Sequence, residues 1–121
     1  MITIANYIGG AMQAPVSNKY IDNFNPSTGK VYSYCPDSDE RDVALAVTAA
    51  HNALQEWKNT PAEKRSRIMQ RIADLIEKRL DEFAQAETID QGKPLWLSKN
   101  GEIPHAISNM QFFATAIEHF S

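Results

Sequence analysis

The chain has 121 residues, of which 43% are hydrophobic and 22% are charged, as in ordinary soluble globular proteins. Its formal net charge of −3 argues against nucleic acid or an anionic membrane surface as a partner. The single cysteine, Cys35, excludes an internal disulfide and favours a reducing compartment. No stretch approaches the ~20 apolar residues of a membrane span, and the N-terminus lacks a secretory pattern. We therefore expect a cytoplasmic protein with no nucleic-acid or membrane partner.

Residues 1–36 have the pattern of short strands and turns, which predicts a small antiparallel β meander. We expect strands at residues 5–8, 19–24 and 31–35. Gly9-Gly10 and the run Asn-Pro-Ser-Thr-Gly at residues 25–29 are typical of the turns between them. A meander of this size is marginally stable alone in water, so we expect a helix to cover it.

Residues 37–121 carry apolar side chains at helical spacing, which predicts three long helices. We expect them at residues 39–57, 61–91 and 94–120, the last with a kink near Pro104. Thr60 and Pro61 are start signals for the central helix, and Gly92 and Pro94 are stop signals. Its apolar stripe must be covered by other elements; it consists of Ile68, Met69, Ile72, Leu75, Ile76, Leu80 and Phe83.

Residue chemistry alone indicates no catalytic site. The sequence contains no Gly-x-Gly-x-x-Gly motif, phosphate loop or paired-cysteine motif. His51, His105 and His119 are far apart in the sequence, and a histidine at a helix surface or helix end is the default interpretation of each. Cys35 has no neighbouring base in the sequence, so we expect an inert, buried thiol. These observations indicate an α-rich module of unknown activity.

Several segments, taken in order, carry a resemblance to a known family. NYIGG at residues 6–10 precedes NPSTG at residues 25–29, and an alanine-rich helix then ends at Trp57. TPAEKR at residues 60–65 opens a long helix that leads to ETIDQGKP at residues 87–94, and FFA follows at residues 112–114. The set resembles the N-terminal part of NAD(P)-dependent aldehyde dehydrogenases over nearly the whole chain. The closing stretch is most similar to the branch that acts on muconate-type semialdehydes.

The resemblance implies an α/β fold: the start of a Rossmann-like cofactor domain spanning residues 1–121, with the meander at 1–36 and helices at 37–121. It implies a parent enzyme that oxidises an aldehyde or semialdehyde to a carboxylate with NAD or NADP. The family's catalytic cysteine, general-base glutamate and phosphate-contacting glycines lie beyond the matched region. We therefore expect no catalytic or cofactor-binding residue in this chain, and neither turnover nor NAD(P) binding by it alone.

The resemblance also implies two sites. Glu102 matches an acidic position near a structural monovalent cation, which backbone carbonyls at Asn23 and Phe24 would help to bind. The alternative is a surface carboxylate beside a helix start.

Gln111 matches a position where related muconate-semialdehyde enzymes carry an arginine that holds a substrate carboxylate. Glutamine keeps hydrogen bonding but lacks the charge and the bidentate fork of arginine. If Gln111 lines the substrate tunnel with Met110 and Ala114, the parent prefers a less acidic aldehyde. The alternative is a polar residue on a helix face.

A second function remains open, that of a stand-alone helical interaction module without catalysis. The helical pattern runs to Phe120 with no helix-ending signal, which we interpret as a fragment. Its expected partner is the remainder of an aldehyde dehydrogenase chain, or a second copy of itself. The resemblance further implies that the parent is a homodimer or homotetramer. The sequence does not identify the aldehyde or the preference between NAD and NADP.

Overall fold

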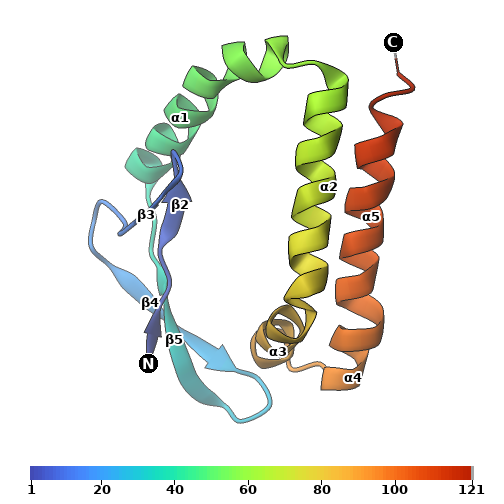
Figure 1. Ribbon diagram of the computed structural model, residues 1–121. Coiled ribbons are helices and arrows are strands. Elements are labelled where there is room, and N and C mark those ends of the chain that lie inside the picture. The colour runs from blue at the N-terminus through green and yellow to red at the C-terminus, as the bar shows by residue number, and fades with distance from the viewer. Residues whose placement is uncertain (121) are drawn as a thin grey trace. The chain divides into compact units, whose positions relative to one another are not determined.

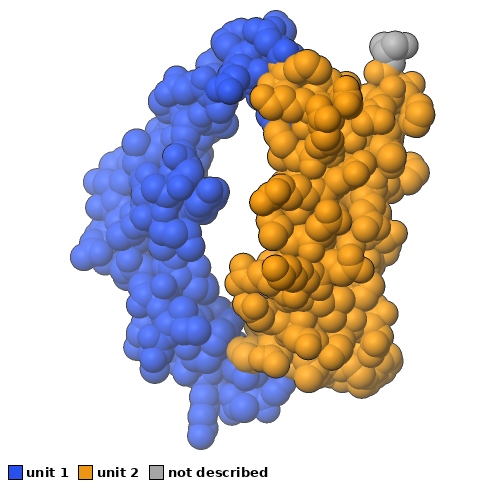
Figure 2. Space-filling view, viewed as in Figure 1, with its two compact units in different colours: residues 1–59 blue, residues 60–121 orange. Residues whose placement is uncertain are grey.

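The structure, a computed structural model, describes residues 1–120, which form two compact units divided between residues 59 and 60 (Figures 1 and 2). The first unit contains the strands β1 to β5 and helix α1, and the second contains the remaining helical elements. The predicted order of short strands followed by helices is confirmed. Helix α1 belongs to the same compact unit as the strands, whereas the sequence pattern grouped it with the helices.

The first unit contains a three-stranded sheet and a separate hairpin. Their strands are β1 (Ile2–Thr3), β2 (Asn6–Ile8), β3 (Ala11–Gln13), β4 (Tyr20–Asn25) and β5 (Lys30–Pro36). The sheet has the order β1-β5-β4, with β4 and β5 antiparallel as predicted. The structure adds β1, which runs parallel to β5, and it pairs β2 with β3 outside the sheet. Strands of two or three residues are too short to show the alternation by which a strand is predicted.

Glycines close the β2–β3 hairpin. Gly9 and Gly10 have φ angles of 62° and 84°, the left-handed region that a two-residue hairpin turn requires. At the β4–β5 turn, the Asn25 side chain accepts a hydrogen bond from the Ser27 amide at 2.9 Å. The Gly29 amide donates to the Asn25 carbonyl at 2.8 Å. Both turns therefore follow the predicted turn chemistry.

Two aspartates lie at the start of helix α1 (Glu40–Asn59): Asp39 just before it and Asp42 in its first turn. Each accepts a hydrogen bond from a backbone amide there. The Asp39 side chain accepts from the Arg41 amide at 3.0 Å, and the Asp42 side chain accepts from the Asp39 amide at 2.9 Å. This reciprocal arrangement satisfies donors that a helix start leaves without helical partners. Arg41 donates hydrogen bonds to the Asp39 carboxylate and lowers its pKa, which keeps the cap ionised. The contribution of this pair to stability is therefore lost only when the pH falls through that lowered pKa.

The second unit consists of helical segments with α2 and α5 side by side and antiparallel (Figure 1). Its elements are α2 (Ala62–Lys78), α3 (Leu80–Gln91), α4 (Leu95–Leu97), the π-helical η1 (Ser98–Glu102) and α5 (Ile103–Ala116). Buried small residues let α2 and α5 approach closely: Ser66 and Ala73 on α2, and Ala114 on α5. Ile107 of α5 is also buried, so this contact forms the core of the unit.

The structure divides the expected central helix at Arg79. Arg79 has φ −109° and ψ 25°, outside the helical region, and it separates α2 from α3. Its side chain pairs with Glu82 at 2.7 Å and lies over the Phe83 ring. Neither Gly nor Pro occurs near this point, so the sequence carries no signal for the break. Gly92, with φ 73°, ends α3 in the left-handed conformation, as its position predicts.

The expected kink near Pro104 occurs as the π-helical turn η1, just before this proline. Pro104 lies in the first turn of α5, but helical backbone precedes it without interruption, so its missing N–H removes a hydrogen bond that a regular helix would make there. The π turn places the buried Ser98 against α3, where it accepts a hydrogen bond from Thr88 at 2.9 Å. This hydrogen bond therefore joins α3 to η1, the turn that leads into α5.

Many apolar side chains are exposed in both units. In the first unit, Val43 and Val47 on α1 are 61% and 59% exposed. In the second, four of the seven residues of the predicted stripe are also exposed: Ile68, Ile72 and Leu75 on α2, and Phe83 on α3. No helix formed by residues 1–120 has the length and apolarity needed to cross a membrane.

The contact between α2 and α5 depends on the small side chain of Ala114. We expect Ala114→Leu to lower the free energy of unfolding by about 1–3 kcal/mol, because extra methylenes overpack a closed contact. Ala106→Leu, on the exposed face of the same helix, is the matched control and is expected to leave it within about 0.5 kcal/mol. Urea denaturation followed by circular dichroism measures both. Equal effects of the two substitutions would contradict the close approach of the helices.

Candidate functional site

Residues with catalytic chemistry do not gather in one place. Within residues 1–120, no three side chains of His, Cys, Asp or Glu are placed to hold a metal ion together. Cys35 is a half-buried free thiol on β5. His51 is exposed on α1, and His105 is exposed on α5 with its Nε2 atom 3.2 Å from the Asn109 amide nitrogen. His119 is exposed beyond the end of α5.

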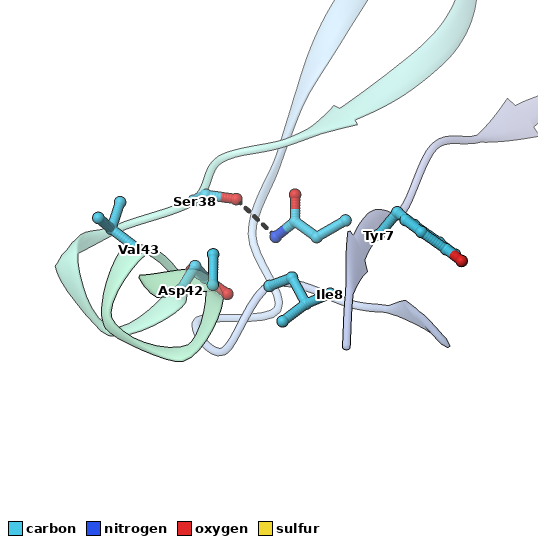
Figure 3. A pocket seen from close by; sticks show the side chains of 7 residues that line it. Tyr7, Ile8, Ser38, Asp42 and Val43 are labelled. Atoms are coloured by element: carbon cyan, nitrogen blue, oxygen red, sulfur yellow. Dashed lines mark hydrogen bonds between the residues drawn. The ribbon is translucent and has the colours of Figure 1, made fainter. Parts of the chain in front are cut away.

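The first unit has a small groove between β2 and the start of α1 (Figure 3). The groove has a volume of about 250 Å³ and is lined by Asn6, Tyr7, Ile8, Ser38, Asp42, Val43 and Ala46. The Asn6 amide donates to the Ser38 hydroxyl at 2.8 Å, and the Tyr7 side chain points away from Asp42 (Figure 3). The charged residue that lines this groove is Asp42.

Asp42 is buried, with 4% of its surface exposed, and both of its carboxylate oxygens accept hydrogen bonds from backbone amides. Oδ1 accepts from Val16 and Oδ2 from Asp39, each at 2.9 Å. These bonds join the loop after β3 to the start of α1. We therefore assign Asp42 a structural role, which the sequence analysis did not identify. An acidic residue three positions after an aspartate N-cap is the signal that predicts such a role.

Glu102, a predicted cation ligand, lies beside a lysine. The Lys93 ammonium is 2.9 Å from the Glu87 carboxylate and 3.5 Å from that of Glu102. The hydrogen bond that the Lys93 ammonium donates to the Glu87 carboxylate is the main cause that raises the pKa of Lys93, with a smaller contribution from the charge of Glu102. An ammonium at this distance would repel a metal cation at Glu102.

The other predicted cation ligands, Asn23 and Phe24, belong to the first unit. They lie on β4, where the pairing register with β5 shifts between them. The Asn23 amide donates to the Tyr32 hydroxyl and to the Ser33 hydroxyl at 3.0 and 3.1 Å. The cation site at Asn23, Phe24 and Glu102 stays a prediction.

The predicted tunnel residues lie on one helix, α5, with different exposure. Gln111 is exposed, Met110 is half-buried and Ala114 is fully buried against α2. Gln111 accepts a hydrogen bond from the Thr115 hydroxyl through its backbone carbonyl, at 2.9 Å. Of the three side chains, that of Gln111 is the most accessible to a ligand. A role of these residues in a substrate tunnel stays a prediction.

Comparison with known proteins identifies the family. Residues 13–121 match the family described as "Aldehyde dehydrogenase family". The chain belongs to the aldehyde dehydrogenase family.

Two relatives in this family are named 2-aminomuconic semialdehyde dehydrogenase. The one from Danio rerio is 45% identical over 98% of this chain, and the one from Bos taurus is 42% identical over 98%. The chain spans about a quarter of the length of these relatives, 24% in each case. A solved NAD⁺ complex of aldehyde dehydrogenase from Bacillus cereus has a TM-score of 0.90 and 29% identity. This match covers 93% of the present chain and 23% of that one.

The structural role assigned to Asp42 in this aldehyde dehydrogenase chain is testable. We expect Asp42→Ala to destabilise the first unit by about 1–3 kcal/mol, because two backbone amides lose their acceptor. Glu40→Ala, at an exposed position in the same helical turn, is the control and is expected to cost less than about 0.5 kcal/mol. Hydrogen exchange at the Val16 amide measures the effect directly. Unchanged exchange there in Asp42→Ala would contradict the assignment.

Proposed function

We propose that this chain is the N-terminal structural segment of an NAD(P)-dependent aldehyde dehydrogenase that oxidises an aldehyde or semialdehyde to a carboxylate. The main support is the match at 45% identity to an enzyme whose printed name is 2-aminomuconic semialdehyde dehydrogenase. The NAD⁺ complex of the Bacillus cereus relative supports NAD as the cofactor. The exposed apolar faces of both units support a structural role, because such faces become stable when other polypeptide covers them.

The chemistry of this reaction supports a division of labour within the parent enzyme. A thiolate attacks the aldehyde carbon, the thiohemiacetal transfers hydride to the nicotinamide, and water hydrolyses the resulting thioester to the carboxylate. These steps need an activated thiolate, a general base and donors for the developing oxyanion. Residues 1–120 contain one thiol, Cys35, and no His, Asp or Glu is paired with it. We therefore assign the reaction to parts of the parent beyond this chain.

Gln111 is the residue from which we propose a substrate preference. A neutral amide in place of an arginine favours an aldehyde that carries no carboxylate group, because the amide lacks the charge that binds such a group. The exposure of Gln111 on α5 is compatible with contact to a ligand, with Met110 and Ala114 next to it on the helix.

Three further properties of the parent are part of this proposal. We propose that the parent is cytoplasmic, in agreement with the single cysteine. It forms a homodimer or a homotetramer. Asn23, Phe24 and Glu102 contribute to a structural cation site, for which Lys93 would have to move away from Glu102.

An interaction module without catalysis is the second candidate, and the exposed apolar side chains also favour it. The two candidates differ in what covers those side chains: the rest of an aldehyde dehydrogenase chain, or an unrelated partner.

A chimera tests the proposal. In it, this chain replaces the matched quarter of the Danio rerio 2-aminomuconic semialdehyde dehydrogenase. We expect aldehyde-dependent NADH formation by the chimera, measured by absorbance, and none by the isolated chain. We also expect Gln111→Arg in the chimera to raise the kcat/KM ratio of an acidic semialdehyde over a neutral aldehyde by about tenfold or more, because a charged partner is restored.

The control is Gln85→Arg, which places the same charge on the exposed face of α3 and is expected to leave this ratio unchanged. A folded chimera without turnover would contradict the proposed function. Activity with no effect of Gln111→Arg would contradict the substrate preference alone.

A further inference from the structure

The face of α5 that points away from α2 carries an imidazole, a carboxamide and an aromatic ring. Ile107 and Ala114 are buried where α5 packs on α2. At about 100° per residue, the opposite face of the helix holds His105, Asn109 and Phe112. All three are exposed, and Phe112 is 64% exposed. This face therefore combines hydrogen-bonding groups with an open apolar surface, which is the chemical composition of small-molecule sites.

Asn109 holds the His105 ring in one tautomer. The Nε2 atom of His105 lies 3.2 Å from the amide nitrogen of Asn109, one helical turn further along. An amide nitrogen only donates, so Nε2 accepts, and the proton of the neutral ring lies on Nδ1. The pair therefore presents the Nδ1–H donor of an exposed ring, with an orientation that a second side chain fixes.

A π-helical turn leads into this face of α5. The turn η1 ends at Glu102, immediately before α5 begins. Such turns are rare, and they occur frequently at functional sites. Gly101, four residues before His105, contributes no side chain that could cover the imidazole. The backbone before α5 therefore leaves the ring open to a ligand.

The charges around this face disfavour an acidic ligand. Residues 100–121 contain no lysine or arginine, and their acidic residues are Glu102 and Glu118. The Lys93 ammonium near Glu102 is engaged by two carboxylates, at 2.9 and 3.5 Å. A carboxylate on a ligand would meet no basic side chain of lysine or arginine on α5, whereas an uncharged oxygen accepts a hydrogen bond from a neutral imidazole.

We infer that His105, oriented by Asn109, binds the aldehyde substrate and selects one that carries an uncharged oxygen acceptor, a hydroxyl or a carbonyl group. The Nδ1–H group donates to that oxygen, and Phe112 packs against the carbon skeleton. His105 is the binding residue and Asn109 is a positioning residue. This inference rests on the proposed function, since it takes the ligand from that reaction. Gln111 lies about 120° around the helix from His105, so substitutions at the two positions test separate contacts.

Substrate selectivity of the chimera described above tests the inference. The two substrates are 6-hydroxyhexanal and heptanal, which differ by a terminal hydroxyl in place of a methyl group. We expect His105→Phe to lower the ratio of kcat/KM for 6-hydroxyhexanal over heptanal about fivefold or more, because one hydrogen bond is lost. His51→Phe, at an exposed position on α1, is the matched control and is expected to leave the ratio unchanged. An unchanged ratio in His105→Phe would overturn the inference.

Substitution of Asn109 tests the positioning role. We expect Asn109→Leu to lower the same ratio by less than His105→Phe does, because the donor remains but its tautomer is no longer fixed. Nitrogen-15 NMR of the imidazole, at a pH where the ring is neutral, reports the tautomer without any need for turnover. The Nδ1–H form is expected for His105 in the unsubstituted chain, with a shift toward the Nε2–H form in Asn109→Leu. A predominant Nε2–H form in the unsubstituted chain would overturn the inference.

Failure of the proposed function is a separate outcome. A folded chimera that oxidises neither aldehyde would contradict the proposed function. Saturation-transfer NMR then compares the binding of the two aldehydes to that chimera, and we expect tighter binding of 6-hydroxyhexanal that His105→Phe abolishes. Equal binding of both would overturn the inference. Turnover of both aldehydes with no dependence on His105 would overturn the inference and leave the proposed function standing.

Discussion

Most of the buried side chains in the described part of this chain are small, which limits how much apolar surface its own residues bury. Among residues 1–120 the buried apolar side chains are those of Ile8, Ala73, Ala84, Ile107 and Ala114, three of them alanine. The accessible surface of the chain is 8865 Å². Two separate compact units, each of half its mass, would together expose about 7,900 Å². The arrangement is one in which helices approach closely through alanine while larger apolar side chains point outward.

This distribution explains why the sequence pattern predicted more core than the structure contains. The stripe on α2 is continuous in sequence, but α5 covers only part of it, and Ile68, Ile72 and Leu75 remain exposed. A periodic pattern identifies which face of a helix is apolar, and it does not identify whether the covering element is present in the same chain. The family match at a quarter of the relatives' length supports the view that other polypeptide covers these faces.

The fold was predictable where local chemistry decides it. Turn residues at Gly9-Gly10 and residues 25–29 located two turns, and Gly92 located the end of α3. The break at Arg79 and the parallel pairing of β1 with β5 were not predictable, because one has no breaker residue and the other joins strands about 30 residues apart. Of the candidate site, the sequence named Gln111 as a candidate, a role that stays a prediction, but it did not identify the buried Asp42. The burial of Asp42 depends on packing between segments that the sequence does not place together.

The central claim is that the open apolar faces of this chain are interfaces to the rest of an aldehyde dehydrogenase. Carbene footprinting of Val43, Val47, Ile72 and Leu75 tests it most directly, by comparing the isolated chain with the chimera. The account predicts strong labelling of these side chains in the isolated chain if it is monomeric, and protection of them in the chimera. Equal labelling in the chimera and in the monomeric chain would contradict it.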